Sequence, residues 1–318
     1  MSAPNSPADR GAALLTIIMI VSVMSVAAVA AVSSLSRSID LSRSASNRSQ
    51  IRLAEQSVLE FGTPLIEHFV AQTLNGQLST EVIPLPFERG LISLTVTDAT
   101  NCFNLNQVGG QDDSLADERY QKLLVSLGFF EADARALSDS LADWIDADNN
   151  PRAYGQESNF YARQSPPYMA ANTTLANLSE LYAIEGYTTE IVNRISPFIC
   201  TRPTTEQTPL NIESLQETDA SLLVTLFSEE MKVDTAEGLI LGRPLDGWGS
   251  TEAFLTHPTI IQIGEHVRND AMISTNPSYI DLHAQINVDS MTRNLTLTYD
   301  IFSNTKPILV QRIIGDHP

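Results

Sequence analysis

Residues 10–32 decide the fold: Arg10-Gly11 is followed by Ala-Ala-Leu-Leu-Thr-Ile-Ile-Met-Ile-Val-Ser-Val-Met-Ser-Val-Ala-Ala-Val-Ala-Ala-Val. The 21 residues from Ala12 to Val32 include no charged side chain. A helix of that length is about 30 Å long, which is enough to cross the hydrocarbon core of a membrane. We therefore expect a membrane-spanning helix over 12–32. The alternative is a secretory signal cleaved near Ala27–Ala31, although the apolar region of such a signal is usually shorter.

The eleven residues before this helix suggest a specific processing event. A short polar leader that ends in Arg-Gly resembles the class III leader of type IV pilins and their relatives. The resemblance implies that a prepilin peptidase cuts between Gly11 and Ala12 and methylates the new N-terminus. The helix then remains, first as a membrane anchor and later as the packing core of a filament.

Two features depart from the usual pilin pattern. Most pilins have a glutamate five residues after the cut, where this chain has Thr16. The pilin pathway keeps the leader on the cytoplasmic side of the membrane. The positive-inside rule predicts the opposite orientation of the helix, because only one basic residue, Arg10, precedes it. The basic residues that follow it are Arg37, Arg43, Arg48 and Arg52.

Charge excludes one class of partner. Beyond residue 52 the chain has 36 acidic and 14 basic side chains. Nucleic-acid backbones attract clustered Lys and Arg, so we expect no nucleic-acid partner. The composition, with 43% hydrophobic residues, is that of folded domains rather than of a disordered chain.

Cys102 and Cys200 are the only cysteines, and both follow the expected anchor. In an oxidising compartment two distant cysteines predict one disulfide. Closing a loop of about 100 residues stabilises a fold by roughly 4–5 kcal/mol in the chain-entropy model. Two buried free thiols are the alternative.

The apolar pattern after the anchor predicts a small domain with a large interruption. Helical spacing continues over 51–72, with a kink or break at Gly62-Thr63-Pro64, unless this part is a flexible stalk. Strands are expected at 81–87, 90–98, 279–288, 294–302 and 307–315. The simplest architecture is α+β: a long N-terminal helix packed on a small antiparallel sheet that is interrupted by an inserted domain. The expected parts are a leader (1–11), the membrane helix (12–32), the rest of the helix with the first strands (33–101), an α-helical insertion (102–270) and the closing strands (271–318).

The insertion contains a helix–Gly–helix pattern twice, around Gly128 and Gly186. The pattern resembles helix-hairpin-helix units, many of which bind DNA through glycine-rich hairpins and basic residues. Here the hairpins have aromatic and acidic residues instead, so we interpret the repeats as scaffold. The sequence gives no positive sign of catalysis, because the histidines lack metal-ligand spacing and no nucleophile motif occurs.

One acidic loop has the spacing of a calcium site. With Asp146 as position 1, Asp148, Asn150 and Glu157 occupy positions 3, 5 and 12 of an EF-hand loop. Calcium takes six to eight oxygen ligands, and alternate side chains of a tight turn with a later Glu can supply them. Pro151 replaces the required glycine, so we expect the ligand pattern on another backbone. Asp143 and Asn159 are possible extra ligands, and Asn172 or Glu180 could contribute to a second site. A solvated acidic turn is the alternative.

Six strings of the chain form a distinctive series: Arg10–Leu15 without a glutamate at Thr16, Asp98–Asn106, Asp143–Asp148, Tyr168–Asn172, Leu178–Leu181 and Thr208–Ile212. In this order and spacing they resemble the family of general secretion pathway protein K, the large minor pseudopilin of bacterial type II secretion. The resemblance implies a pilin-like fold with an α-helical insertion, bound calcium and a Cys102–Cys200 disulfide. It also implies a single-pass inner-membrane protein with a periplasmic globular region, and a non-enzymatic role at the tip of the pseudopilus.

The implied partners are I- and J-type minor pseudopilins, other pseudopilins and the prepilin peptidase. In the family, the glutamate that Thr16 replaces pairs with the N-terminal amine of the subunit packed ahead of it in the filament. A subunit at the tip has no such neighbour, so the resemblance implies that a chain with Thr16 in place of the glutamate fits the tip. Two other functions stay open at this stage: a minor pilin of a type IV pilus or competence system, and a signal-anchored periplasmic metal-dependent hydrolase.

Overall fold

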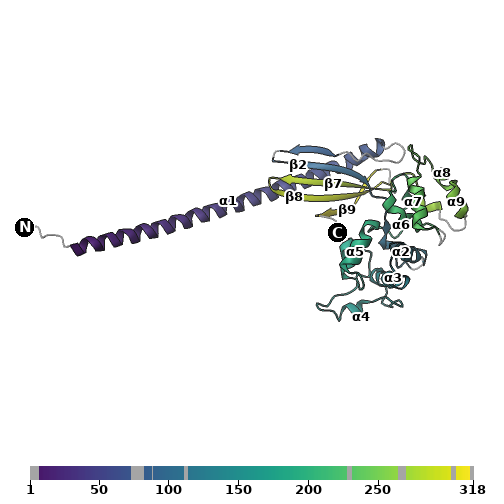
Figure 1. The fold of residues 1–318 in the computed structure, drawn as a ribbon, viewed down its shortest axis with the longest axis horizontal. Coiled ribbons are helices and arrows are strands. Elements are labelled where there is room, and N and C mark those ends of the chain that lie inside the picture. Colours follow the sequence, from purple (N-terminus) through teal and green to yellow (C-terminus); the bar gives the residue numbers. More distant parts are fainter. Residues whose placement is uncertain are drawn as a thin grey trace, which may run out of the picture.

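The computed structural model describes residues 7–72, 82–87, 89–110, 114–227, 231–263, 270–301 and 306–315. Its longest element is helix α1 (Pro7–Gln72), which projects far from the rest of the molecule (Figure 1). Every residue from 14 to 45 is exposed, so this half of α1 packs on nothing else in the described chain. It includes one segment that is apolar and long enough to cross a membrane. The hydroxyls of Ser22 and Ser25 donate to carbonyls one turn back, at 2.8 Å each, which satisfies them within the apolar run.

The second half of α1 packs on a five-stranded antiparallel sheet of order β1-β2-β7-β8-β9. The strands are β1 (Ile83–Phe87), β2 (Gly90–Asp98), β7 (Tyr279–Val288), β8 (Met291–Asp300) and β9 (Ile308–Ile314). Their apolar residues alternate, so one face is buried against α1 while the other is polar. The expected α+β architecture and its strands are confirmed.

Of the expected kink or break at Gly62-Thr63-Pro64, a break does not occur, because α1 continues through Pro64. Proline removes one hydrogen bond and crowds the preceding turn, which costs about 3 kcal/mol in a helix interior. Packing of this turn on the sheet offsets that cost: Ile66 is fully buried, and Gly62 lies against Tyr299. A Cβ at Gly62 would lie 2.2 Å from the Tyr299 hydroxyl oxygen, so only glycine permits this approach.

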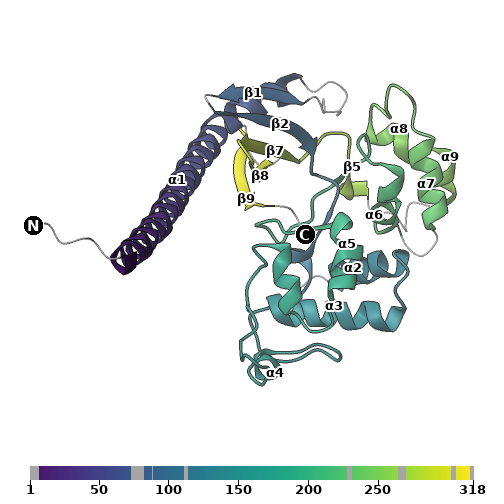
Figure 2. The same cartoon turned by 60° about the vertical axis from the view of Figure 1, so that its left-hand side comes forward.

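The connection between β2 and β7 forms the insertion (Figure 2), and this insertion has a separate hydrophobic core. Its α-helices are α2 (Ser114–Ser126), α3 (Glu131–Ile145), α4 (Ser158–Tyr161), α5 (Thr189–Ile195), α6 (Ala220–Val224), α7 (Val233–Leu241), α8 (Thr251–Leu255) and α9 (Pro258–Ile263). Short 3-10 turns are η1 (Leu105–Gln107), η2 (Leu178–Ala183), η3 (Ser196–Phe198), η4 (Glu217–Asp219) and η6 (Asp270–Met272).

Two parallel strand pairs complete the insertion: β3 (Phe103–Asn104) with β4 (Ile199–Cys200), and β5 (Leu210–Asn211) with β6 (Ile273–Ser274). Pairing of β6 with β5 means that the packing of the insertion extends beyond the expected end at residue 270. Both hairpin glycines, Gly128 and Gly186, have positive φ, at 86° and 89°. The element before Gly186 is the 3-10 turn η2 rather than an α-helix.

Candidate metal centre

The acidic loop begins at the end of α3, the helix that positions Asp143. The apolar face of α3 is buried in the core of the insertion, and Asp143 lies within that face beside Trp144. The Asp143 side chain is 0% exposed. A carboxylate removed from water is costly unless hydrogen bonds or a cation compensate it, so its partners decide what this loop can do.

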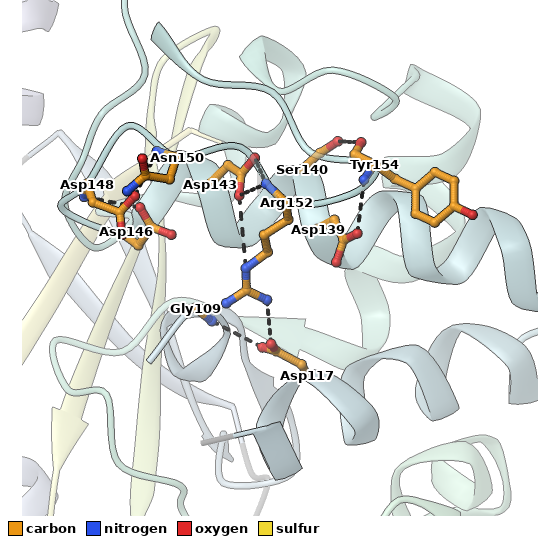
Figure 3. A network of polar contacts seen from close by, with 10 residues as sticks. All are labelled: Gly109, Asp117, Asp139, Ser140, Asp143, Asp146, Asp148, Asn150, Arg152 and Tyr154. Atoms are coloured by element: carbon orange, nitrogen blue, oxygen red, sulfur yellow. Dashed lines mark hydrogen bonds and ion pairs between the residues drawn. The ribbon is translucent and has the colours of Figure 1, made fainter. Parts of the chain in front are cut away.

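Arg152 supplies part of that compensation as the loop turns back over α3 (Figure 3). Its backbone N–H donates to the two Asp143 carboxylate oxygens, at 3.2 and 3.1 Å. Its guanidinium lies 3.9 Å from Asp143 Oδ1 and forms an ion pair with Asp117 of α2. Asp117 in turn accepts the Gly109 N–H at 3.1 Å. Arg152 therefore ties the loop to two neighbouring parts of the insertion.

Gly155 is required for the close approach of the loop to α3. A Cβ at this position would lie 2.0 Å from Asp143 Oδ2 and 2.9 Å from the Asp139 carbonyl oxygen. Neither distance is possible for real atoms in contact, so a larger residue would displace the loop from Asp143. The backbone N–H of the preceding residue, Tyr154, donates to Asp139 Oδ2 at 3.1 Å and holds the same turn.

Three carboxylates meet in the centre of the loop. Asp143, Asp146 and Glu157 each offer one oxygen, and these oxygens all lie within 4.8 Å of one another. Glu157 is 4% exposed, and neither of its carboxylate oxygens has a hydrogen-bond partner in the described part of the chain. Buried, unpaired carboxylate oxygens beside two further carboxylates fit a hard cation such as calcium, which these oxygens would coordinate.

The electrostatics show the cost of this cluster without a cation. Burial, with repulsion from Asp143 and Asp146, raises the pKa of Glu157 to about 7. Burial also raises the pKa of Asp143 to about 6, with repulsion from Asp146 added and the Arg152 N–H opposing. The pKa of Asp146 is raised by burial and by Asp148. In all three groups desolvation is the largest cause, and repulsion by neighbouring carboxylates adds to it.

The other predicted ligands lie around this group rather than in it. Asp146 accepts the Asp148 N–H at 3.3 Å, and Asp148 accepts the Asn150 N–H at 2.7 Å, as two successive Asx turns (Figure 3). Asp148 is exposed and is not one of the three clustered carboxylates. The side chains of Asn150 and Asn159 are also exposed. The structure thus brings together the first and last positions of the EF-like pattern with Asp143.

Asn172 lies against the same loop, although the sequence suggested it only for a second site. Its Nδ2 donates to the Asp148 carbonyl at 3.0 Å, and its backbone N–H donates to the Trp144 carbonyl at 2.9 Å. It has a positive φ of 48°, and its buried Oδ1 has no partner in the described chain. Glu180 instead closes a capping box at the start of η2. The roles of Arg152 and Asp117 were missed, since nothing in the sequence links residues 35 positions apart.

The predicted disulfide is confirmed at the root of the insertion. Cys102 and Cys200 are bonded, with their Cα atoms 5.8 Å apart, next to the parallel pair β3–β4. The other predicted site, the peptidase cut between Gly11 and Ala12, involves side chains that lie outside the described residues.

Comparison with known proteins gives a consistent family. The family model described as type II secretion system (T2SS), protein K, matches residues 101–204, and a second model of the same description matches 210–276. An Escherichia coli K12 relative named as a type II secretion system protein K is 32% identical over 81% of this chain and 85% of its own length. The Pectobacterium carotovorum protein K is 29% identical over 76% of this chain and 78% of its own length.

A solved structure shares the fold. A chain in the crystal structure of the GspK-GspI-GspJ complex from the enterotoxigenic Escherichia coli type 2 secretion system superimposes with a TM-score of 0.71. The alignment covers 85% of this chain and 99% of that chain at 22% identity. The likeness therefore extends over both the helix–sheet part and the insertion.

Proposed function

This chain belongs to the type II secretion system protein K family, and we propose that it is a structural minor pseudopilin that initiates or caps the pseudopilus. The observation that carries the proposal is the exposed half of α1. Residues 14–45 pack on nothing in the described chain, and most of the large side chains of this segment are apolar. Such a surface must be covered by lipid or by other apolar helices. Lipid covers this surface while the helix is a membrane anchor, and other apolar helices cover it once the helix enters the core of a filament.

Position at the tip follows from two features at opposite ends of the molecule. Thr16 provides no carboxylate for the N-terminal amine of a subunit ahead of it. The insertion spreads sideways from the sheet, far wider than α1 itself, and would fit poorly within a shaft of packed subunits (Figure 1). The partners are then the I- and J-type minor pseudopilins. The crystal structure that shares the fold is that of a complex of GspK with GspI and GspJ, which supports that choice.

Processing would follow the pilin pathway. The prepilin peptidase cuts between Gly11 and Ala12 and methylates Ala12, and the protein stays in the inner membrane with its globular region in the periplasm. This orientation places the acidic insertion outside the cytoplasm, where a Cys102–Cys200 disulfide is stable.

Calcium is the second part of the proposal. Asp143, Asp146 and Glu157 would hold the ion, and the unpartnered buried oxygens of Glu157 support this choice. Calcium would neutralise three carboxylates that otherwise repel one another and would stiffen the loop between α3 and α4. The role of the calcium ion would be structural, because it would balance the charge of the three carboxylates and connect separate parts of the loop.

The experiment for the structural role is complementation of a strain that lacks its own protein K. We expect the full chain to restore export of secreted proteins, and a periplasmic form without residues 12–32 to restore none. Restoration by the anchorless form would contradict the filament role and favour a soluble enzyme.

Calcium is tested on the full chain in detergent by titration calorimetry. The double variant Asp143→Asn/Glu157→Gln should lose most of its calcium affinity. A matched control, Asp133→Asn/Glu131→Gln, changes the same charges at exposed positions of α3 and should bind as the wild type does. Equal calcium affinity in all three proteins would refute the site.

A further inference from the structure

One side of the molecule combines exposed arginines with exposed apolar side chains. On α1 it comprises Arg37, Leu41, Arg48 and Arg52, all of them exposed. Their spacings of four, seven and four residues place them on one face of a helix with 3.6 residues per turn. Glu55, three residues further on the same face, lies 3.4 Å from Arg312 of β9 and 3.8 Å from Arg293 of β8. This face of α1 therefore lies on the same side of the molecule as the β8–β9 edge of the sheet.

At that edge the helix–sheet core is open. Among the described residues β9 pairs only with β8, so its outer backbone groups face away from the sheet (Figure 2). Leu309 and Ile314 pair with Tyr299 and Leu295, which are buried against α1, yet Leu309 is 39% exposed and Ile314 48%. An edge strand of this kind is a ready surface for another chain unless charge or cover protects it.

We call this combined area the β9-side surface: Arg37, Leu41, Arg48 and Arg52 of α1, Arg293 of β8, and Leu309, Arg312 and Ile314 of β9. It carries five arginines in a chain with a net charge of −19. The insertion, by contrast, has 26 acidic and 10 basic residues between 102 and 270. No ion pair of Arg37, Arg48 or Arg52 occurs within the described part of the chain. The molecule is thus polarised, with cations gathered beside α1.

Distance along the helix decides between a membrane and a protein as the occupant. Arg48 and Arg52 follow Val32, the last residue of the uncharged membrane segment 12–32, by 16 and 20 residues, or about 24 and 30 Å of helix. The headgroup layer extends only about 5–8 Å beyond the hydrocarbon core, and charges are screened within about 8 Å at physiological salt. Lipid headgroups can reach Arg37, but the surface as a whole runs along the molecule, parallel to α1.

We propose that the β9-side surface binds a neighbouring pseudopilin subunit through a carboxylate-bearing face with an apolar centre. Arg37, Arg48 and Arg52 pair with the carboxylates, and Leu309 and Ile314 pack on the apolar centre. Arg293 and Arg312, which hold Glu55, add positive charge beside them. Complementary charge of this kind fixes the register between partners and suppresses wrong ones. The inference rests on the proposed function and adds to it which side of the chain meets the partner.

Charge reversal tests the proposal on the full chain, co-expressed with I- and J-type pseudopilins and purified in mild detergent. The double variant Arg48→Glu/Arg52→Glu should lower recovery of the partners by about tenfold. The matched control Arg135→Glu/Arg163→Glu changes the net charge equally at exposed positions of the insertion, away from this surface and from α1. This control should retain wild-type recovery.

The outcomes separate the two proposals. Wild-type recovery of partners by both double variants would overturn the β9-side surface and leave the proposed function intact. Failure of the wild-type chain itself to recover either partner would overturn the proposed function, and this inference with it. Loss of recovery by the control as strongly as by Arg48→Glu/Arg52→Glu would show a general charge effect and would also overturn the assignment.

A photo-crosslinking residue gives a second test that needs no loss of binding. Placed at Leu309 in the full chain in membranes, it should crosslink to an I- or J-type subunit. Placed at Leu91 of β2, which is equally exposed at 39%, it should crosslink to neither. Crosslinks from position 309 to lipid alone would favour a membrane surface and overturn the proposal.

Discussion

The helix–sheet part and the insertion reach stability by different means. In the helix–sheet part, which consists of α1 and the five-stranded sheet, one core is formed by α1 and alternate residues of long strands. Most of its stability therefore comes from a repeating apolar pattern. In the insertion, short helices and turns surround a larger core, and buried polar side chains hold the connecting segments. Asn106, for example, donates to the carbonyls of Leu175 and Arg202 and accepts the Leu175 N–H.

This difference predicts in which part of the molecule a single substitution changes the stability most. A regular pattern spreads its stabilisation over many equivalent positions, so one substitution removes a fraction of it. A segment without regular structure must satisfy its backbone groups one by one, and one side chain can serve several of them. We expect the insertion to respond to polar and covalent changes that leave the sheet unaffected.

The largest effect should come from removing the disulfide. In Cys102→Ser/Cys200→Ser, the unfolded insertion regains the freedom of a loop of 98 residues. The expected loss is about 4–5 kcal/mol. Hydrogen–deuterium exchange of the full chain should rise in α2 and α3, while β7 and β8 keep their protection. Equal loss of protection in both parts would contradict separate stabilisation.

The second effect concerns Asn106 alone. Asn106→Leu has a similar volume but leaves three buried backbone groups unpaired, which should lower the free energy of unfolding of the insertion by about 3 kcal/mol. Denaturant melts of the full chain, followed by exchange in the same two parts, measure it. The exposed control Asn159→Leu should change the stability by less than about 0.5 kcal/mol. A loss below about 1 kcal/mol in Asn106→Leu would argue that the backbone finds other partners.

A third change tests the helix–sheet part. Gly62→Ala places a Cβ 2.2 Å from the Tyr299 hydroxyl oxygen and should destabilise this part by about 2 kcal/mol through overpacking. The next neighbours, Tyr299 Cζ and Leu282 Cδ2, lie at 3.3 and 3.4 Å, so the hydroxyl is the main obstacle. Gly62→Ala/Tyr299→Phe should therefore recover most of the loss in thermal melts. Additive losses in the double variant would show that the clash lies elsewhere.

The smallest effect is expected within the acidic loop between α3 and α4. Asp148 is exposed and stands outside the three clustered carboxylates, so Asp148→Asn should lower calcium affinity by less than about threefold. Asp146→Asn removes a charge inside the cluster and should lower it by about tenfold or more. Calorimetric titration compares the two variants. Equal losses would show that Asp148 coordinates the ion directly, as the EF-like spacing suggested.

Regular parts of the chain were predictable because their pattern is local. The long helix, the strands and helices α2 and α3 follow from apolar periodicity alone. The sequence could not decide whether Pro64 ends the helix, because its tolerance depends on Gly62 and Ile66 packing against distant strands. The 3-10 turn before Gly186 has apolar spacing too short to distinguish it from an α-helix.

The acidic loop shows the same limit at the level of single residues. The EF-like spacing predicted Asp146 and Glu157, two of the three carboxylates that meet in the structure, since such a spacing is local in sequence. The spacing gave Asp143 only as a possible extra ligand. A carboxylate within the apolar face of a helix cannot be recognised as part of a site from sequence, because the loop that folds back over it is a tertiary contact. The pairing of Arg152 with Asp117, and the need for Gly155, arise only from tertiary contacts.

The most direct test of the central claim, that this chain is a pseudopilin, is the mass of its N-terminal peptide. The peptide is isolated from membranes of cells with and without the prepilin peptidase. We expect a peptide that begins at methylated Ala12 only when the peptidase is present. A peptide that retains Met1 in both strains, or one cut near Ala31, would contradict the pilin pathway and remove the filament from the account.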